Sequence, residues 1–184
     1  YDLDGWLDIF AANGHIEEEI ALVQPKVKFA QTPLVFHNLG KSKFEDVSTK
    51  LGPDLAKPMV ARGAAYADFD RDGDLDVLIT GNHGPAVLYR NDAARGNNWL
   101  SVKLKGAKSN TSAIGAVVRI ESASGKQWRT VHSGSSYCSQ SDLALTFGLG
   151  RDASVPTVEI EWPSGYKQRL TNVKPNQHLV IEEA

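Results

Sequence analysis

The most chemically suggestive part of the sequence is the acidic run from residue 68 to residue 76. Aspartates occupy every second position of this run, and Gly73 is its sixth residue. Carboxylates packed this closely repel one another unless a cation neutralises them, and Ca²⁺ prefers about six to eight oxygen ligands. Glycine tolerates the sharp turn that would point the flanking carboxylates inward. We therefore predict a Ca²⁺ site whose ligands are the side chains of Asp68, Asp70, Asp72 and Asp76 and the backbone carbonyl of Asp74. The alternative is a solvated acidic turn between two strands.

A copy of this acidic run opens the sequence, where residues 1–10 align with residues 69–78. The copy predicts a second, weaker Ca²⁺ site whose ligands are the side chains of Asp2, Asp4 and Asp8 and the backbone carbonyl of Trp6. The counterpart of Asp68 would precede the first residue, so this loop reads as cut through and the chain as the C-terminal piece of a longer protein. Residues 34–38 and 87–91 also resemble each other and follow the two runs in the same order. Such recurrence is typical of stacked repeats or propeller blades.

Short strands are expected to position both acidic runs. Alternating apolar residues predict strands at residues 7–12, 34–38, 44–47, 63–69, 75–80 and 86–89. The second run would then join two antiparallel strands, whereas a helix–loop–helix calcium hand needs helices on both sides. Residues 16–23 are expected to form a short helix with Ile16, Ile20 and Val23 on one face, and Pro25 ends it.

The polar, glycine-containing stretch at residues 91–98 predicts a boundary, because the sequence pattern changes after it. Short alternating segments follow near residues 100–104, 116–120, 127–131, 143–147, 158–162, 166–170 and 178–181. About seven short strands with regular turns between them are typical of an all-β sandwich or barrel. Trp99 and Trp162 lie in alternating strands and are expected in the core, whereas the polar neighbours of Trp128 leave its place open.

Composition narrows the class of protein. The net charge is −2, but residues 1–92 hold 15 acidic and 9 basic side chains, a net −6, and residues 93–184 hold 7 acidic and 11 basic ones, a net +4. The basic residues are scattered rather than gathered in a stripe, which argues against nucleic-acid binding. No apolar run approaches the roughly 20 residues that span a bilayer, so no transmembrane segment is expected. Cys138 is the single cysteine, which excludes an internal disulfide. Calcium loops suit an extracellular or periplasmic, secreted protein.

Two segments of the sequence resemble known families. Residues 62–76, Arg-Gly-Ala-Ala-Tyr-Ala-Asp-Phe-Asp-Arg-Asp-Gly-Asp-Leu-Asp, are similar to VCBS/FG-GAP repeats, the calcium-loop blades of integrin-like β-propellers. Residues 97–184 resemble an ASPIC/UnbV domain through motifs at residues 98–100, 109–116, 133–140, 147–150 and 161–165. The resemblance implies an all-β chain, with partial, N-terminally truncated propeller blades over residues 1–92 and a β-sandwich or barrel-like domain over residues 97–184. A closed propeller has at least about four blades, so the missing blades either lie outside this chain or are supplied by other chains.

The stretch that invites a catalytic assignment is the Ser133–Gln140 loop. Its serines lack the strand-to-helix elbow of a Gly-x-Ser-x-Gly nucleophile, and no helix is expected after them. We therefore assign no catalytic residue and expect no enzyme. The loop is expected to bond its own backbone, while Tyr137 and Gln140 leave a sugar or peptide ligand open. Cys138 is expected to be half-buried.

These expectations converge on a non-enzymatic, calcium-stabilised binding or adhesion module with a protein or glycan partner. The Ca²⁺ ion would hold the two strands of a blade at a fixed angle. Two alternatives stay open. The chain could be a structural subunit that associates with other chains through the truncated propeller, or it could be a calcium-dependent glycan-binding module.

Overall fold

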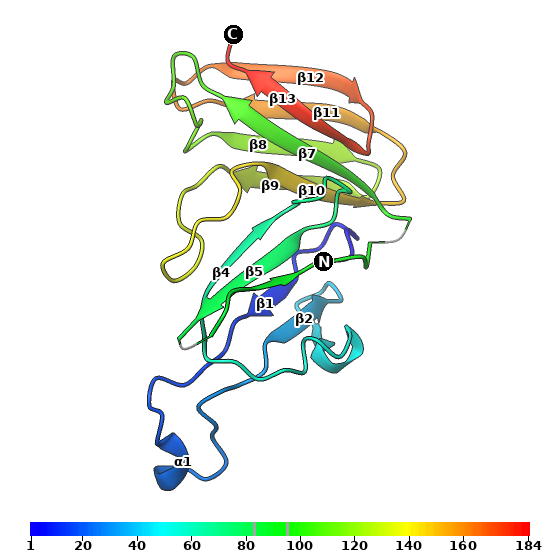
Figure 1. Cartoon of the computed structure of the whole chain (residues 1–184). Coiled ribbons are helices and arrows are strands. Elements are labelled where there is room, and N and C mark those ends of the chain that lie inside the picture. The colour runs from blue at the N-terminus through cyan, green and yellow to red at the C-terminus, as the bar shows by residue number, and fades with distance from the viewer. Residues whose placement is uncertain (83, 95) are drawn as a thin grey trace.

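The computed structural model describes residues 1–82, 84–94 and 96–184, and strands dominate these ranges (Figure 1). We call residues 1–92 the repeat region and residues 97–184 the C-terminal region. Within the described ranges each region contains a pair of β-sheets. In Figure 1 the C-terminal region lies above the repeat region. The all-β class that the sequence predicts is confirmed.

The strands of the repeat region are β1 (Ile9–Ala11), β2 (Leu34–Asn38), β3 (Phe44–Asp46), β4 (Ala61–Ala67), β5 (Asp76–Gly81) and β6 (Val87–Tyr89). One sheet has the order β1-β2-β3 and the other has the order β4-β5-β6. The pairs β1–β2 and β5–β6 share one register, because Ile9 faces Phe36 in the first and Val77 faces Tyr89 in the second. Each sheet adds its third strand at a different edge, β3 beside β2 and β4 beside β5. The predicted internal repeat is therefore present.

The strands of the C-terminal region are β7 (Asn98–Lys105), β8 (Val117–Ser122), β9 (Gly125–Thr130), β10 (Leu145–Gly150), β11 (Val155–Glu161), β12 (Lys167–Val173) and β13 (Gln177–Glu182). They form one sheet of order β10-β7-β13 and a second of order β12-β11-β8-β9. Alternate side chains of both sheets are buried in one core, among them Leu100, Val102, Phe147, Val158 and Ile160. Two sheets that share a core in this way form a β-sandwich. No closed barrel forms among the described strands.

One feature of the fold was not predicted from the sequence, and one prediction was wrong. Strand β13 pairs with β7 in parallel, so the first and last strands of the C-terminal region lie side by side. The expected helix over residues 16–23 is wrong in extent, since only α1 (Ile20–Val23) is helical. Ile16 and Val23 are each 79% exposed, so the expected apolar face has nothing to pack against. A short helix without packing is marginal in water, and Figure 1 shows α1 on an arm that projects from the repeat region.

A loop of the C-terminal region covers the outer edge of β4. The backbone N–H of Ala64 donates to Ser136 Oγ (3.3 Å), and the N–H of Tyr66 donates to Ser141 Oγ (3.2 Å). In return the N–H of Asp142 donates to the carbonyl of Tyr66 (3.0 Å). Because an unpaired strand edge can template aggregation, this loop both protects β4 and fixes the C-terminal region against the strand that leads into the acidic loop.

Candidate metal centre

The acidic loop of residues 68–76 connects β4 to β5, as the sequence predicts. Two residues turn the backbone through the left-handed region, Arg71 with a φ of 65° and Gly73 with a φ of 103°. The backbone N–H of Gly73 donates to Asp68 Oδ2 (3.0 Å), and the N–H of Asp74 donates to Asp72 Oδ1 (2.9 Å). These bonds wrap the loop around its own carboxylates.

The loop brings Asp68, Asp70 and Asp72 together. Each offers a carboxylate oxygen that lies within 4.8 Å of the others. Ca²⁺–oxygen distances are about 2.3–2.6 Å, so oxygens with this spacing can share one ion. The Asp68 side chain is only 7% exposed, and its Oδ1 has no hydrogen-bond partner among the described residues. A buried aspartate that has an unpartnered oxygen and belongs to a group of three carboxylates fits a cation.

Burial raises the pKa of the Asp68 carboxyl and of the Asp74 carboxyl above their ordinary values. The raised pKa values mean that the charged form of each carboxyl is disfavoured where it lies, chiefly by the loss of water around it. A cation in the loop would offset this cost, because it favours the charged carboxylate.

Asp76 and Asp74 hold the loop rather than join the group of three. Asp76 is almost fully buried, and its two oxygens accept the backbone N–H groups of Phe69 (3.1 Å) and Asn91 (2.8 Å). Asp74 Oδ2 accepts the N–H of Ala94 (3.2 Å), which ties the segment after β6 to the loop. The assignment of the Asp76 side chain and the Asp74 carbonyl as metal ligands stays a prediction.

The loop at residues 1–8 repeats this frame. Leu3 and Gly5 turn the backbone with φ values of 58° and 101°, in the places of Arg71 and Gly73. Trp6 donates its N–H to Asp4 Oδ1 (2.8 Å), as Asp74 does to Asp72.

Its anchor residue is also repeated. The Asp8 carboxylate accepts hydrogen bonds from the amino group of Tyr1 and the backbone N–H of Asn38, both at 2.7 Å. The Asp76 carboxylate accepts the equivalent bonds from the N–H groups of Phe69 and Asn91. The predicted correspondence of the two acidic runs therefore extends to individual hydrogen bonds.

The ligand group of the first loop contains a histidine that the sequence analysis missed. Asp2, Asp4 and His37 offer atoms within 4.8 Å of one another, and His37 Nδ1 lies 3.7 Å from Asp2 Oδ2. The same nitrogen lies 3.2 Å from Asp8 Oδ1, so Asp8 is again an anchor on the far side of the group. The alignment of residues 34–38 with residues 87–91 could have found His37, because it places His37 directly before the asparagine that binds Asp8.

The C-terminal region also reaches the second acidic loop, which no local sequence pattern predicted. The Trp99 side chain lies over Gly73, where an added Cβ would be 2.1 Å from the indole ring. The His178 ring packs against Trp99 at a tilt of 58°, with ring centroids 4.7 Å apart, and its Nε2 lies 3.5 Å from Asp68 Oδ2. The loop is therefore enclosed on one side by residues of the other region.

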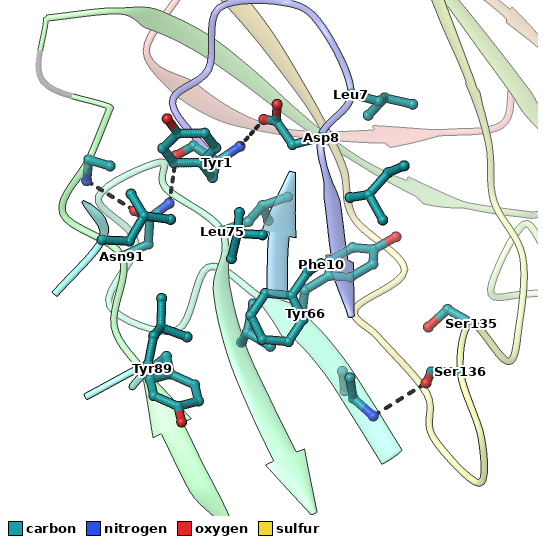
Figure 2. A pocket seen from close by; sticks show the side chains of 18 of the residues that line it. Tyr1, Leu7, Asp8, Phe10, Tyr66, Leu75, Tyr89, Asn91, Ser135 and Ser136 are labelled. Atoms are coloured by element: carbon teal, nitrogen blue, oxygen red, sulfur yellow. Dashed lines mark hydrogen bonds and ion pairs between the residues drawn. The ribbon is translucent and has the colours of Figure 1, made fainter. Parts of the chain in front are cut away.

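A large open hollow lies between the sheets of the repeat region and β9. Figure 2 shows Tyr1, Phe10, Tyr66 and Tyr89 along it, with Ser135 and Ser136 at its rim. Its volume is about 2100 Å³, whereas pockets for small molecules measure about 300–1,000 Å³. The hollow is thus larger than a small-molecule site. Trp128 also lines it and is 65% exposed.

The Ser133–Gln140 loop is occupied with its own hydrogen bonds. Ser135 Oγ pairs with Ser141 Oγ (2.6 Å), and Gly134 N–H donates to Gln140 Oε1 (2.7 Å). His132 Nδ1 pairs with the carbonyl of Thr130 (3.0 Å). The expectation that Cys138 is half-buried is wrong, since its side chain is exposed at a turn where its φ is 48°. Trp99 and Trp162 are buried, as expected.

Comparison with known proteins finds two family models that match separate parts of the chain. Residues 1–79 match the family model of the FG-GAP-like repeat, and residues 106–184 match that of ASPIC and UnbV. Cartilage acidic protein 1 of Mus musculus is 36% identical over 126 residues, which cover 65% of this chain and 19% of that protein. The Homo sapiens protein of the same name is 35% identical over 109 residues, 56% of this chain and 16% of that protein. The chain thus spans less than a fifth of the length of these relatives. In the described residues, no helix has the length and apolar character to cross a membrane.

Proposed function

Because the chain joins an FG-GAP-like repeat segment to an ASPIC and UnbV domain, we propose that it is a non-enzymatic binding or adhesion module that acts outside the cell and holds Ca²⁺ in the loop of residues 68–76. The observation that carries the metal assignment is the buried Asp68, whose Oδ1 has no hydrogen-bond partner among the described residues and whose carboxylate is grouped with those of Asp70 and Asp72. The name of its relatives, cartilage acidic protein, ties those proteins to an extracellular tissue and supports the proposed location.

The chemistry of the donors favours a hard cation. The three grouped atoms are carboxylate oxygens, the ligands that Ca²⁺ prefers, and water or backbone carbonyls can fill the remaining positions. A bound ion supplies charge neutralisation and no reaction. The residues of the chain do the positioning. Gly73 turns the loop, and Asp76 at its end accepts hydrogen bonds from the N–H of Phe69 near its start and from the N–H of Asn91 after β6.

The surroundings of the candidate nucleophiles support a role without catalysis. A nucleophilic serine needs a base within hydrogen-bond reach and a group that orients that base. Ser135 is instead paired with a second serine, and His132 is turned toward a backbone carbonyl.

The large hollow supports a macromolecular partner, and it favours one alternative, a structural subunit of a larger assembly. Leu88 and Leu78 of the repeat region are 50% and 41% exposed, and Leu88 lines the hollow with Trp128. Apolar faces of this kind mark protein interaction surfaces. Sedimentation velocity at several concentrations tests the assembly, since a monomer at every concentration would argue against self-association. The calcium-dependent glycan-binding alternative is tested on a glycan array with and without chelator.

The calcium assignment is tested by calorimetric titration of the full chain and by its melting temperature with Ca²⁺ and with chelator. We expect a dissociation constant on the order of 10⁻⁴–10⁻³ M, as in other extracellular modules. Asp70→Ala should abolish most of the stabilisation by Ca²⁺ and change the melting temperature little in chelator, because the Asp70 side chain is exposed.

Asp54→Ala is the matched control for this test. It removes one exposed aspartate of the same region whose partner is Lys57 rather than the loop. Equal losses for Asp70→Ala in calcium and in chelator would contradict the metal assignment.

A further inference from the structure

The second acidic loop is one of the places where the repeat region and the C-terminal region meet. Trp99, at the start of β7, is 9% exposed and packs with Leu3 and Ala94 in a small core of its own. Its ring also covers Gly73 so closely that an added Cβ would lie 2.1 Å from it, so the ring would have to move for any other residue. The outer wall of the loop is therefore made by a side chain of the neighbouring region.

Two backbone hydrogen bonds hold Trp99 in this position. The N–H of Trp99 donates to Asn176 Oδ1 (3.1 Å), and the N–H of Asn176 donates to the carbonyl of Trp99 (2.6 Å). Asn176 has a φ of 58°, which directs the chain into β13, where His178 follows. The parallel pairing of β7 with β13 thus places the His178 ring against the Trp99 ring.

His178 faces Asp68 across a contact that is left incomplete. Nε2 of His178 is buried and, like Asp68 Oδ1, has no hydrogen-bond partner among the described residues. It lies 3.5 Å from Asp68 Oδ2, the oxygen that also accepts the N–H of Gly73. Asp68 therefore has Oδ2 toward His178 and the Gly73 N–H, while its Oδ1 has no hydrogen-bond partner in the part of the chain that the structure describes.

The geometry makes His178 a neighbour of the ligand group rather than a member of it. The atoms that lie within 4.8 Å of one another belong to Asp68, Asp70 and Asp72, and the group does not include His178. A side chain that touches a ligand on the side away from the ion orients that ligand, and its loss typically weakens metal binding.

We propose that His178 is a positioning residue for the cation loop, and that with Trp99 it makes Ca²⁺ binding and the docking of the C-terminal region depend on each other. The inference rests on the proposed function and adds to it that residues of the C-terminal region hold the Ca²⁺ loop in place. Coupling between two binding events is reciprocal. A cation that orders Asp68 therefore also strengthens its contact with the C-terminal region.

The test uses Ca²⁺ alone, titrated calorimetrically into the full chain and its variants. His178→Phe keeps a ring against Trp99 and removes both ring nitrogens. We expect Ca²⁺ to bind this variant about 10–100-fold more weakly, the usual effect of losing a residue that orients a ligand. His178→Gln, which can place an amide N–H near Asp68, should recover most of the affinity. His132→Phe is the matched control, because His132 is an exposed histidine of the same region that bonds to the Thr130 carbonyl.

A second measurement follows the docking itself. We expect Ca²⁺ to slow amide hydrogen exchange at residues 97–101 in the wild type and in His132→Phe, and to slow it less in His178→Phe. The inference would be overturned if a folded His178→Phe bound Ca²⁺ with unchanged affinity and if Ca²⁺ did not change the exchange rate at residues 97–101. The proposed function would stand in that case.

Failure of the wild type to bind Ca²⁺ would overturn the proposed function and this inference with it. If His178→Phe does not fold, Trp99→Phe decides, since it keeps a smaller ring over Gly73. Its Ca²⁺ affinity should fall, and an affinity equal to that of the wild type would count against the coupling.

Discussion

The two acidic loops have the same backbone but different surroundings. Both turn through a glycine with a φ near 100°, and both anchor an aspartate to an asparagine at or just after the end of the paired strand, Asn38 in β2 and Asn91 after β6. The second loop gathers three carboxylates under Trp99 and His178, whereas the first gathers two carboxylates and His37, and its Trp6 is 59% exposed. The repeat thus encodes a turn, and the residues around the turn decide what it holds.

The largest difference is expected when the two turn glycines are replaced by alanine. Both substitutions force a side chain into the left-handed region, which costs about 1–3 kcal/mol. Gly73→Ala also drives a Cβ to 2.1 Å from the Trp99 ring, while the Cβ of Gly5→Ala would meet its nearest atoms at 3.4 Å. We expect Gly73→Ala to cost about 2–6 kcal/mol, because overpacking against Trp99 adds about 1–3 kcal/mol to the backbone strain. We expect Gly5→Ala to cost only the backbone strain, about 1–3 kcal/mol. Urea unfolding measures both, and equal costs would show that Trp99 yields easily.

A smaller difference between the loops is expected at the anchors. Asp76→Ala and Asp8→Ala each remove a buried carboxylate that accepts two backbone or terminal N–H groups. Hydrogen bonds to charged groups contribute about 1.5–3 kcal/mol each, so we expect each variant to lose roughly 3–6 kcal/mol of unfolding free energy. The loss should persist in chelator, because the anchor bonds do not involve the ion. A loss confined to calcium buffer would instead make Asp76 a metal ligand.

The cation itself should separate the loops further. Asp70 and Asp2 occupy equivalent positions, yet we expect only Asp70→Ala to remove a large part of the stabilisation by Ca²⁺. That stabilisation is about 2.7 kcal/mol when Ca²⁺ is at 100 times its dissociation constant. Thermal unfolding of both variants at one Ca²⁺ concentration makes the comparison. Equal sensitivity would show that the first loop binds as strongly as the second.

The smallest effect concerns β3, the strand that the first sheet adds beside β2 and that has no counterpart beside β6. In β3 the Asp46 carboxylate accepts the hydroxyl and the N–H of Ser48, and these bonds lower the pKa of Asp46. A carboxyl whose pKa is lowered in the folded state stabilises the fold at pH values above its ordinary pKa of 3.8. That stabilisation is lost as the pH falls through the lowered pKa.

Asp46 holds Ser48, whose Oγ accepts the N–H of Val35 in β2 (2.8 Å). We therefore expect Asp46→Asn to loosen this contact and to speed amide exchange in β2 at neutral pH. The difference from the wild type should shrink on acidification below about pH 4. Because Asp46 is exposed, global unfolding should change little. A pH-independent difference would assign the effect to packing.

Most of the fold could be predicted because its strands alternate with period two. The bounds of β2 match the expected residues 34–38, and most other strands lie within about two residues of expectation, within the usual uncertainty of strand ends. The turn at Gly73 was also predictable, since the φ it needs is one that glycine adopts freely. The buried Trp99 and Trp162 followed from the same alternation.

The rest depended on contacts between distant parts of the chain. His178 and Trp99 reach the loop only because β13 pairs with β7 in parallel, and no local pattern specifies a parallel partner. The expected helix at residues 16–23 failed because propensity and spacing do not show whether a face will find a surface to cover. Cys138 was misplaced for a local reason, because it lies in a tight turn closed by a bridge between Ser136 and Ser139.

The parallel pairing of β7 and β13 has a consequence for the order of biosynthesis. Residues 68–76 leave the ribosome long before Asn176 and His178, so the nascent loop is made without the wall that later encloses it. Until the final strand is added, Trp99 lacks both Asn176, its hydrogen-bond partner, and His178, the ring that packs against it. A chain interrupted before β13 would expose that indole and its apolar neighbours, which are features that chaperones recognise in unfinished proteins.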